Sequence, residues 1–243
     1  MSTARRSLAL SLVNVYETLA ISLPTVVDAA LHRVEKHVCD DRLRDWARKI
    51  VGHARIDLEV RGRENMQPGV TYLIMSNHQS HYDVPVLFHV IGSNLRMITK
   101  EELFKVPIFG GGMRAAGFIS IDRKNRHRAM ASLAKAKETL AGGVHIWIAP
   151  EGTRSPNGEL LPFKKGGFNL ALEAELPVLP VSVEGTRHVL RAKGVRSTPG
   201  VHVTVTIHPP IFPERYKHLD FKKGRDQMIA DVREILERGR ISA

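Results

Sequence analysis

The pattern of apolar and polar positions divides the chain near residue 52. Residues 7–27 (SLALSLVNVYETLAISLPTVV) are mainly apolar, and the run is about long enough to cross a bilayer. Asn14 and Glu17 interrupt the run, and Pro24 is expected to kink or end a helix there. We therefore expect a first helix that lies in or dips into one leaflet. A second, amphipathic helix is expected over residues 25–51, with Arg and Lys on its polar face.

The N-terminal region has two other interpretations. The two helices could form a hairpin that simply packs on the rest of the protein, and the pattern leaves this alternative open. A signal peptide is less favoured, because Arg5 and Arg6 are not followed by a clean apolar stretch and a small-residue cleavage site.

After residue 52, short segments rich in β-forming residues alternate with helical ones. This alternation predicts an α/β fold with a mixed, mostly parallel central sheet flanked by helices. We expect a membrane-associated helical pair over residues 1–51 and one α/β domain over residues 52–243. The predicted strands cover residues 56–60, 72–76, 95–99, 118–121, 144–149, 178–183 and 201–207.

The clearest helical pattern covers residues 127–141. Ala129, Leu133, Ala136 and Leu140 share one face, and two glycines follow as a stop signal. Further helices are expected after Asp83, Lys165 and Phe221.

Composition and charge narrow the possible partners. A length of 243 residues fits one sizeable domain with an appendage. The formal net charge of +11 would attract anionic lipid surfaces, nucleic acid or acidic carrier proteins. Nucleic acid is disfavoured, since only 6% of residues are aromatic and no basic stripe carries interleaved rings for stacking. The single cysteine, Cys39, excludes an internal disulfide and by itself gives no metal cluster.

The first candidate for chemistry is the segment SNHQSHYD, which follows the predicted strand 72–76. His78 and Asp83 stand five positions apart across an expected turn into a helix. At this spacing a carboxylate can reach one ring nitrogen, so that the other nitrogen acts as a general base. His81 is a competing base in the same loop.

Two further segments carry charges after predicted strands. In residues 99–123, Lys100 follows a strand, three glycines begin at Gly110, and Arg123 ends the next strand. The glycines match neither nucleotide-binding pattern, so taken alone this segment indicates a flexible turn with solvated charges.

The segment PEGTRS directly follows the predicted strand 144–149. Arg154 offers a planar fork of donors for a phosphate, and Glu151 could orient it or bind a substrate hydroxyl. A purely structural ion pair between Glu151 and Arg154 is the alternative. The segment LPVLPVSVEG over residues 176–185 is expected to shape the pocket or simply to form a core strand.

Together these four segments resemble the blocks of the glycerolipid acyltransferase family, which includes 1-acylglycerol-3-phosphate acyltransferases. NHQSHYD is similar to the family's NHxxxxD block, residues 100–123 to its second block, PEGTRS to its third and LPVLPVSV to its fourth, in the same order. One departure is Ala149, where an aromatic or bulky residue is common in the family.

The resemblance implies the roles of individual residues. His78 would be the general base and Asp83 its partner. Residues that bind substrate would be Lys100, Arg123, Glu151, Gly152, Thr153 and Arg154. Of these, Lys100 would bind charged substrate groups or the oxyanion, and Glu151, Gly152 and Arg154 would belong to the site for the acceptor phosphate.

The resemblance also implies an activity. The protein would move a fatty acyl group from acyl-CoA or acyl-carrier protein to the sn-2 hydroxyl of 1-acylglycerol 3-phosphate, giving phosphatidic acid. The thioester is a co-substrate, and no cofactor or metal is expected. We expect a monotopic or peripheral protein at the cytoplasmic face of a membrane with anionic lipids. Another acceptor within the family, or a lipid-binding protein without catalysis, remains the alternative.

Overall fold

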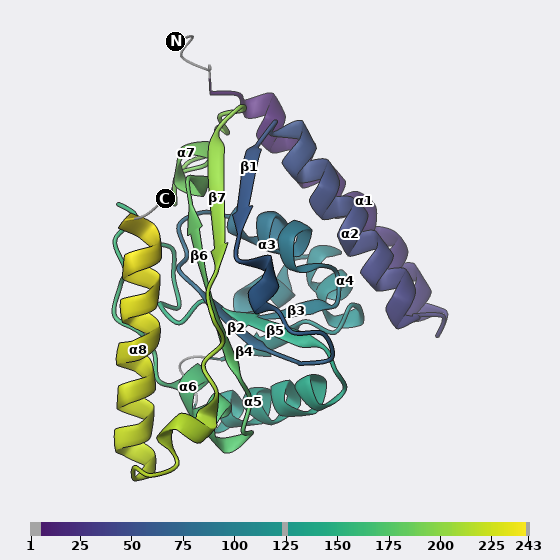
Figure 1. The fold of residues 1–243 in the computed structure, drawn as a ribbon. Helices are drawn as coiled ribbons and strands as arrows, with labels where there is room; N and C mark the ends of the chain where they lie inside the picture. Colours follow the sequence, from purple (N-terminus) through teal and green to yellow (C-terminus); the bar gives the residue numbers. More distant parts are fainter. Residues whose placement is uncertain (1–5, 123–125, 242–243) are drawn as a thin grey trace.

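The computed structural model describes residues 6–122 and 126–241 and contains one seven-stranded sheet (Figure 1). Its strand order is β1-β7-β6-β2-β5-β3-β4, and every neighbouring pair is parallel except β6 and β7, which are antiparallel. The strands are β1 Asp57–Arg61, β2 Leu73–Ser76, β3 Leu95–Lys100, β4 Ile119–Ile121, β5 His145–Ile148, β6 Val178–Glu184 and β7 His202–Ile207. All seven predicted strands and the mostly parallel α/β fold are confirmed.

Helices cover both faces of the sheet. On one side lie α1 Leu8–Ala30, α2 Lys36–His53, α3 Asp83–Ile91 and α4 Phe109–Ala115, and on the other lie α5 Arg126–Ala141, α6 Gly166–Glu173 and α8 Phe221–Ile241 (Figure 1). The short helix α7 Thr186–Val189 follows β6, and the 3-10 helices are η1 Arg63–Asn65, η2 Glu101–Lys105 and η3 Pro213–Tyr216. The helices predicted after Asp83, Lys165 and Phe221 are confirmed.

Helix α5 begins within a residue of its predicted start and ends where predicted. Ala136 and Leu140 are buried under the sheet, and Leu133 packs at the edge of the same cluster. The side chain of Ala129 lies outside the described part of the chain.

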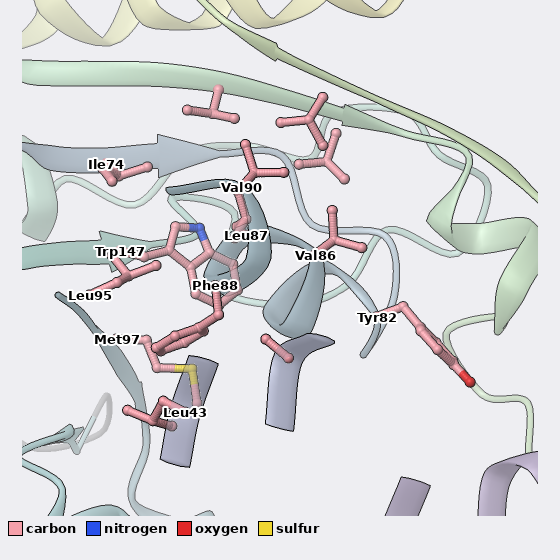
Figure 2. Close-up of a cluster of buried hydrophobic side chains, with 14 of the residues drawn as sticks. Leu43, Ile74, Tyr82, Val86, Leu87, Phe88, Val90, Leu95, Met97 and Trp147 are labelled. Atoms are coloured by element: carbon pink, nitrogen blue, oxygen red, sulfur yellow. The ribbon is translucent and has the colours of Figure 1, made fainter. Parts of the chain in front are cut away.

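The sheet separates two apolar clusters, because successive side chains of a strand point to opposite faces. In β2, Ile74 faces the cluster beneath α2 and α3, whereas Leu73 and Met75 face the cluster beneath α5, α6 and α8. Figure 2 shows the first cluster, which includes Phe88 of α3, Trp147 of β5 and Leu43 of α2. Helix α2 therefore buries its apolar face in the same core as the sheet.

The two N-terminal helices meet at a different place from the one the sequence predicts. Helix α1 continues through Pro24 to Ala30, and α2 begins only at Lys36, so the predicted second helix from residue 25 is wrong at its start. Pro24 removes one amide from the helix, but Arg42 of α2 binds the following turn. Its guanidinium donates to Thr25 at 3.1 Å and to Asp28 at 2.7 Å. These contacts hold the last turn of α1 against α2.

Helix α1 turns its polar side chains inward and its apolar side chains outward. Its buried residues are Glu17, Ser22 and Thr25. The carboxylate of Glu17 accepts from Lys49 at 2.9 Å, and Thr18 accepts from the Trp46 indole at 3.1 Å. Its exposed apolar side chains are Leu8, Leu12, Val13, Val15, Tyr16, Leu19, Leu23 and Val27. By length and composition, α1 is also the one helix among the described residues that could cross a membrane.

Candidate active site

The candidate site forms where the carboxyl ends of three neighbouring parallel strands meet. Strand β2 pairs in parallel with both β5 and β6, so the segments that leave these three strands emerge at one edge of the sheet. His78 follows β2, Glu151 follows β5 and Thr186 follows β6. The topology therefore brings together side chains more than 100 residues apart.

His78 and Asp83 form the hydrogen-bonded pair that their spacing predicts. Nδ1 of His78 lies 2.7 Å from Oδ2 of Asp83. The Asp83 side chain is completely buried, whereas 18% of the His78 side chain is exposed. The carboxylate fixes the proton on Nδ1, so Nε2 is left as the acceptor on the ring.

Asp83 is held by more than the imidazole. Its Oδ2 also accepts from the main-chain N–H groups of Gln79 at 2.7 Å and Ser80 at 2.9 Å, and its Oδ1 accepts from the Thr186 hydroxyl. These hydrogen bonds hold the carboxylate in one orientation, so the imidazole meets a fixed partner.

A glycine places the Thr186 hydroxyl at this carboxylate. Gly185 has φ +94°, and a Cβ built on it would lie 2.2 Å from the carbonyl oxygen of His202. Only glycine permits this turn between β6 and α7.

The ring of His78 rests against a tryptophan. The rings of His78 and Trp147 are 5.7 Å apart between centroids and nearly perpendicular, at 86°. The Trp147 indole donates to Oγ of Ser76 at 2.8 Å, so its own position is fixed by β2. This packing restricts rotation of the imidazole away from Asp83.

The carboxylate of Glu151 accepts hydrogen bonds from two main-chain N–H groups. Its Oε1 accepts from the N–H of His78 at 2.8 Å, and its Oε2 accepts from the N–H of Leu161 at 2.9 Å. The residue is buried, and burial raises the pKa of Glu151 while the two hydrogen bonds oppose that shift. Within the described residues no ion pair joins it to Arg154, so the structural ion pair considered as an alternative is absent.

The rest of PEGTRS forms a tight turn over the site. Gly152 has φ +72° and donates to the carbonyl of Ala149 at 3.0 Å, Thr153 is exposed, and Arg154 is half-buried. Burial lowers the pKa of Arg154, and the charge of Asp83 opposes the shift. The turn is tied to the histidine loop, because the N–H of Ser155 donates to the carbonyl of His78 at 2.7 Å.

Lys100 ends β3 as an exposed side chain near the same loop. Its charge contributes, after desolvation and the charges of Arg154 and His78, to lowering the pKa of His81 to about 4. His81 therefore stays neutral at neutral pH, and both cations lie in its neighbourhood. Arg123 lies outside the described residues.

The three glycines beginning at Gly110 have a packing role. They lie in α4, where the N–H groups of Gly110 and Gly112 donate to the carbonyls of Val106 and Ile108 at 2.8 and 2.9 Å. A Cβ on Gly110 would lie 2.2 Å from the carbonyl oxygen of Phe104. The expected flexible turn is therefore a helix, and these two amides are already paired, so they offer no donors for an oxyanion.

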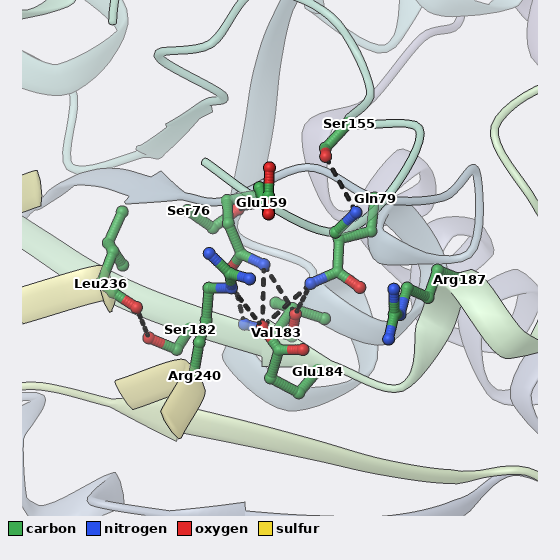
Figure 3. Close-up of polar contacts among 12 residues, drawn as sticks. Ser76, Gln79, Ser155, Glu159, Ser182, Val183, Glu184, Arg187, Leu236 and Arg240 are labelled. Carbon is green, nitrogen blue, oxygen red and sulfur yellow. Dashed lines mark hydrogen bonds and ion pairs between the residues drawn. The ribbon is translucent and has the colours of Figure 1, made fainter. Parts of the chain in front are cut away.

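A polar network joins the loop that carries His78 to helix α8 (Figure 3). Nε2 of Gln79 donates to the Val183 carbonyl at 3.1 Å and to Oε1 of Glu184 at 2.9 Å. Nε of Arg240, in α8, donates to the same carboxylate oxygen at 3.1 Å. The network braces the turn in which Gln79 binds Asp83.

Three supporting residues were missed at the level of sequence: Gln79, Trp147 and Thr186. Each lies within or beside a block that was recognised, but each acts through a partner more than 70 residues away or through its main chain. A signal existed for Thr186, because a hydroxyl directly after a strand and a glycine is well placed to bind at the sheet edge.

Comparisons with known proteins indicate the family of the chain. A family model described as Acyltransferase matches residues 57–184, which include His78, Asp83 and PEGTRS. The 1-acyl-sn-glycerol-3-phosphate acyltransferase alpha of Ovis aries is 35% identical over 190 residues, covering 76% of this chain and 66% of that protein. The 1-acyl-sn-glycerol-3-phosphate acyltransferase of Saccharomyces cerevisiae is 35% identical over 187 residues, covering 74% of this chain and 61% of that protein.

A solved structure is similar over nearly the whole chain. The 1-acyl-sn-glycerophosphate acyltransferase PlsC from Thermotoga maritima superposes with a TM-score of 0.79 at 27% identity, covering 96% of this chain and 94% of that one. This chain spans about two thirds or less of the length of the sheep and yeast relatives. The matched family model covers more than half of the chain and contains the His78 and Asp83 pair, and the chain therefore belongs to the acyltransferase family.

Proposed function

We propose that this protein transfers a fatty acyl group from a thioester carrier to the sn-2 hydroxyl of 1-acylglycerol 3-phosphate, giving phosphatidic acid. The observation that carries the proposal is the 2.7 Å contact between Nδ1 of His78 and the fully buried carboxylate of Asp83. The names of the similar proteins support this acceptor.

In the proposed reaction, Nε2 of His78 takes the proton of the acceptor hydroxyl while its oxygen attacks the thioester carbonyl. General base catalysis of this kind contributes about 10²- to 10⁴-fold to the rate. The tetrahedral intermediate then expels the thiolate, which takes the proton from the imidazolium. A thiol with a pKa of about 8.5 leaves readily, so the step needs no stronger acid. Acyl-CoA or acyl-carrier protein is the co-substrate, and the reaction uses no resident cofactor.

Arg154 and Lys100 are proposed to bind the acceptor phosphate. The charges of both act to lower the pKa of His81, which belongs to the loop that carries His78. A guanidinium fork suits a phosphate, and holding that group would place the hydroxyl beside the base. Thr153 and Gly152, in the same turn, are proposed to shape this subsite.

Localisation is proposed from helix α1. Its outward apolar face suits a lipid surface, and its inward polar face is occupied by the protein. Val106 and Ile108, just before α4, are further exposed apolar side chains. We place the protein at the cytoplasmic face of a membrane, as a monotopic or peripheral enzyme.

His78→Ala tests the function. The variant should lose transfer by about 10²-fold or more while keeping its circular dichroism spectrum and its vesicle binding. His218→Ala, at an exposed histidine far along the chain, is the matched control and should keep full activity. Thiol release from acyl-CoA in the presence of lysophosphatidic acid is the measurement, and residual activity close to wild type in His78→Ala would remove this residue as the base.

The identities of the acceptor and the donor are tested in separate experiments. A panel of lysophospholipids and glycerol 3-phosphate against one labelled donor separates the proposed acceptor from the family alternatives. Acyl-CoA and acyl-carrier protein are compared in the same assay. If no acceptor and no donor supported thiol release by a folded protein, the chain would be a lipid-binding protein instead.

A further inference from the structure

A cationic cavity lies at the start of helix α1, away from the loop that carries His78. It has a volume of about 270 Å³, and its ionisable lining side chains are Arg6, His188, Arg191 and Arg196. It lies between residues 188–198 and Arg6, which stands just before α1. Figure 1 shows α7 and the first turn of α1 at the same end of the molecule.

The two walls of the cavity are fastened to each other. The main chains of Ser7 and Ser197 bond in both directions, with N to O distances of 2.7 and 3.1 Å. The hydroxyls of Ser11 and Ser197 lie 2.8 Å apart, and Ser197 is fully buried. The cavity is thus a built feature with a fixed separation between Arg6 and the opposite wall.

The cavity carries positive charge with no internal counterion. Its lining contains no carboxylate. Within the described residues Arg6, Arg191 and Arg196 form no ion pair with an acid, whereas other arginines do, as Arg42 does with Asp28 at 2.7 Å. Three guanidinium groups gathered without an acid form a site for a phosphate ester.

The surroundings of the cavity indicate where that phosphate comes from. Arg6 precedes the apolar helix by a single residue, and Leu12, one turn further along, is 61% exposed. On the other wall, Val195 is 69% exposed beside Arg196. Cations directly at the end of an outward apolar face lie at the depth of lipid phosphates when that face enters a bilayer.

From this juxtaposition we infer that the cavity formed by Arg6, Arg191 and Arg196 binds the phosphate of an anionic phospholipid headgroup. The inference rests on the membrane association proposed above and is independent of acyl transfer. The bound lipid is a docking ligand, distinct from the acceptor proposed at Arg154. It would fix the start of α1 and the loop after α7 at the membrane surface.

The cavity is also joined to the loop that carries His78. The Ser80 hydroxyl donates to the carbonyl of Leu190 at 2.8 Å, and Tyr82 accepts from Asn14 of α1. Docking of a headgroup would therefore hold the segment that carries His78 and Asp83 at a fixed height over the lipid.

The test compares two double variants of the full chain that each remove two positive charges. Arg191→Gln with Arg196→Gln changes the cavity. Lys137→Gln with Lys222→Gln is the control, since these exposed lysines lie in α5 and at the start of α8, at the other end of the molecule in Figure 1. Co-sedimentation is measured with phosphatidylcholine vesicles and with the same vesicles containing phosphatidic acid, without acyl donor. Circular dichroism checks folding.

We expect the cavity variant to lose partition onto the anionic vesicles by roughly ten- to thirtyfold and the control by less than about twofold. Partition onto neutral vesicles should change little in either. Equal losses in both variants would mean diffuse attraction and would overturn the site, as would no loss in either. Failure of the unaltered protein to bind any vesicle would overturn membrane association itself, and thiol release would still report on acyl transfer.

A third arm excludes a soluble ligand. The cavity variant is assayed for its KM toward acyl-CoA, with the acceptor in neutral detergent micelles. The inference predicts an unchanged KM. A raised KM together with unchanged vesicle partition would assign the cavity to the phosphates of the soluble donor and overturn it.

Discussion

Oε1 of Glu151 accepts a hydrogen bond of 2.8 Å from the main-chain N–H of His78, and its other oxygen accepts from Leu161. The glutamate of PEGTRS thus fixes the backbone of the proposed base. This contact joins the loops after β2 and β5 into one unit. It also distinguishes the two charged residues of the segment, because Glu151 binds main chain whereas Arg154 is the one proposed to bind the acceptor phosphate.

Glu151→Gln should destabilise the fold and lower activity together. The amide group would turn a donor toward one of the two main-chain N–H groups, leaving that buried donor unpaired at a cost of about 1–3 kcal/mol in the free energy of unfolding. Denaturant unfolding and thiol release are the measurements. Glu138→Gln, at an exposed position on α5, is the control and should change neither. Unaltered stability in Glu151→Gln would show that the carboxylate is dispensable for the loop.

Thr186→Val should reduce kcat and leave KM nearly unchanged. The substitution keeps the volume but removes the hydroxyl that donates to Asp83, so the fully buried carboxylate loses one donor. We expect kcat to fall roughly tenfold, the equivalent of about 1.4 kcal/mol. Thr186→Ser, which retains the hydroxyl, should recover most of the rate. If both variants lost activity equally, the effect would be packing and not the hydrogen bond.

His81→Gln should leave the acid limb of the pH-rate profile in place. Desolvation, followed by the charge of Arg154, lowers the pKa of His81 to about 4, so the residue is already neutral where the reaction runs. A profile that lost its acid limb in this variant would transfer the role of base to His81. Activity measured from pH 5 to 8 distinguishes the two.

The lowered pKa of His81 also predicts how the stability of the protein changes with pH. Unfolded His81 binds a proton below about pH 6.5, but folded His81 does so only below about pH 4. The unfolded state therefore takes up more protons between these values, and the contribution of this residue to stability falls as the pH drops from 6.5 to 4. Replacement by Gln should flatten that part of the curve of unfolding free energy against pH.

Gly110→Ala and Gly52→Ala should change stability in opposite directions. A Cβ at Gly110 would approach the Phe104 carbonyl to 2.2 Å, so α4 would have to move away from η2. At Gly52, inside α2, a Cβ meets nothing within 4 Å, and Ala should stabilise the protein by roughly 0.5–1 kcal/mol. Thermal unfolding of both variants is the measurement, and a stabilised Gly110→Ala protein would contradict the packing role.

The sheet and the central pair were accessible from sequence for clear physical reasons. Seven apolar segments were short enough to be strands, and segments with helical periodicity lay between them. This alternation predicts a mostly parallel sheet. The histidine and the aspartate are joined by one turn between β2 and α3, so their contact is local and their spacing predicts it.

The features that sequence reasoning missed depend on distant parts of the chain. Glu151 binds a main-chain group, and nothing in its sequence neighbourhood marks which one. The inward side of α1 consists of polar residues whose partners, such as Trp46 and Lys49, belong to α2. The same polar residues look like interruptions when the helix is considered alone. Pro24 is a similar case, because the turn that follows it is held by hydrogen bonds from Arg42 of α2, which the sequence around Pro24 does not indicate.

The inverted polarity of α1 makes it unsuitable for removal as a mere anchor. Cutting it away to obtain a simpler catalytic fragment would strip hydrogen-bonding partners from the Trp46 indole, the Lys49 ammonium and the Tyr82 hydroxyl, the last of which belongs to the loop of the proposed base. Such a fragment would differ from the intact enzyme in its chemistry as well as in its attachment. A truncated protein that turned over slowly would then report damage to the loop, and comparison with the full chain in detergent would be needed to measure what the lipid surface itself contributes.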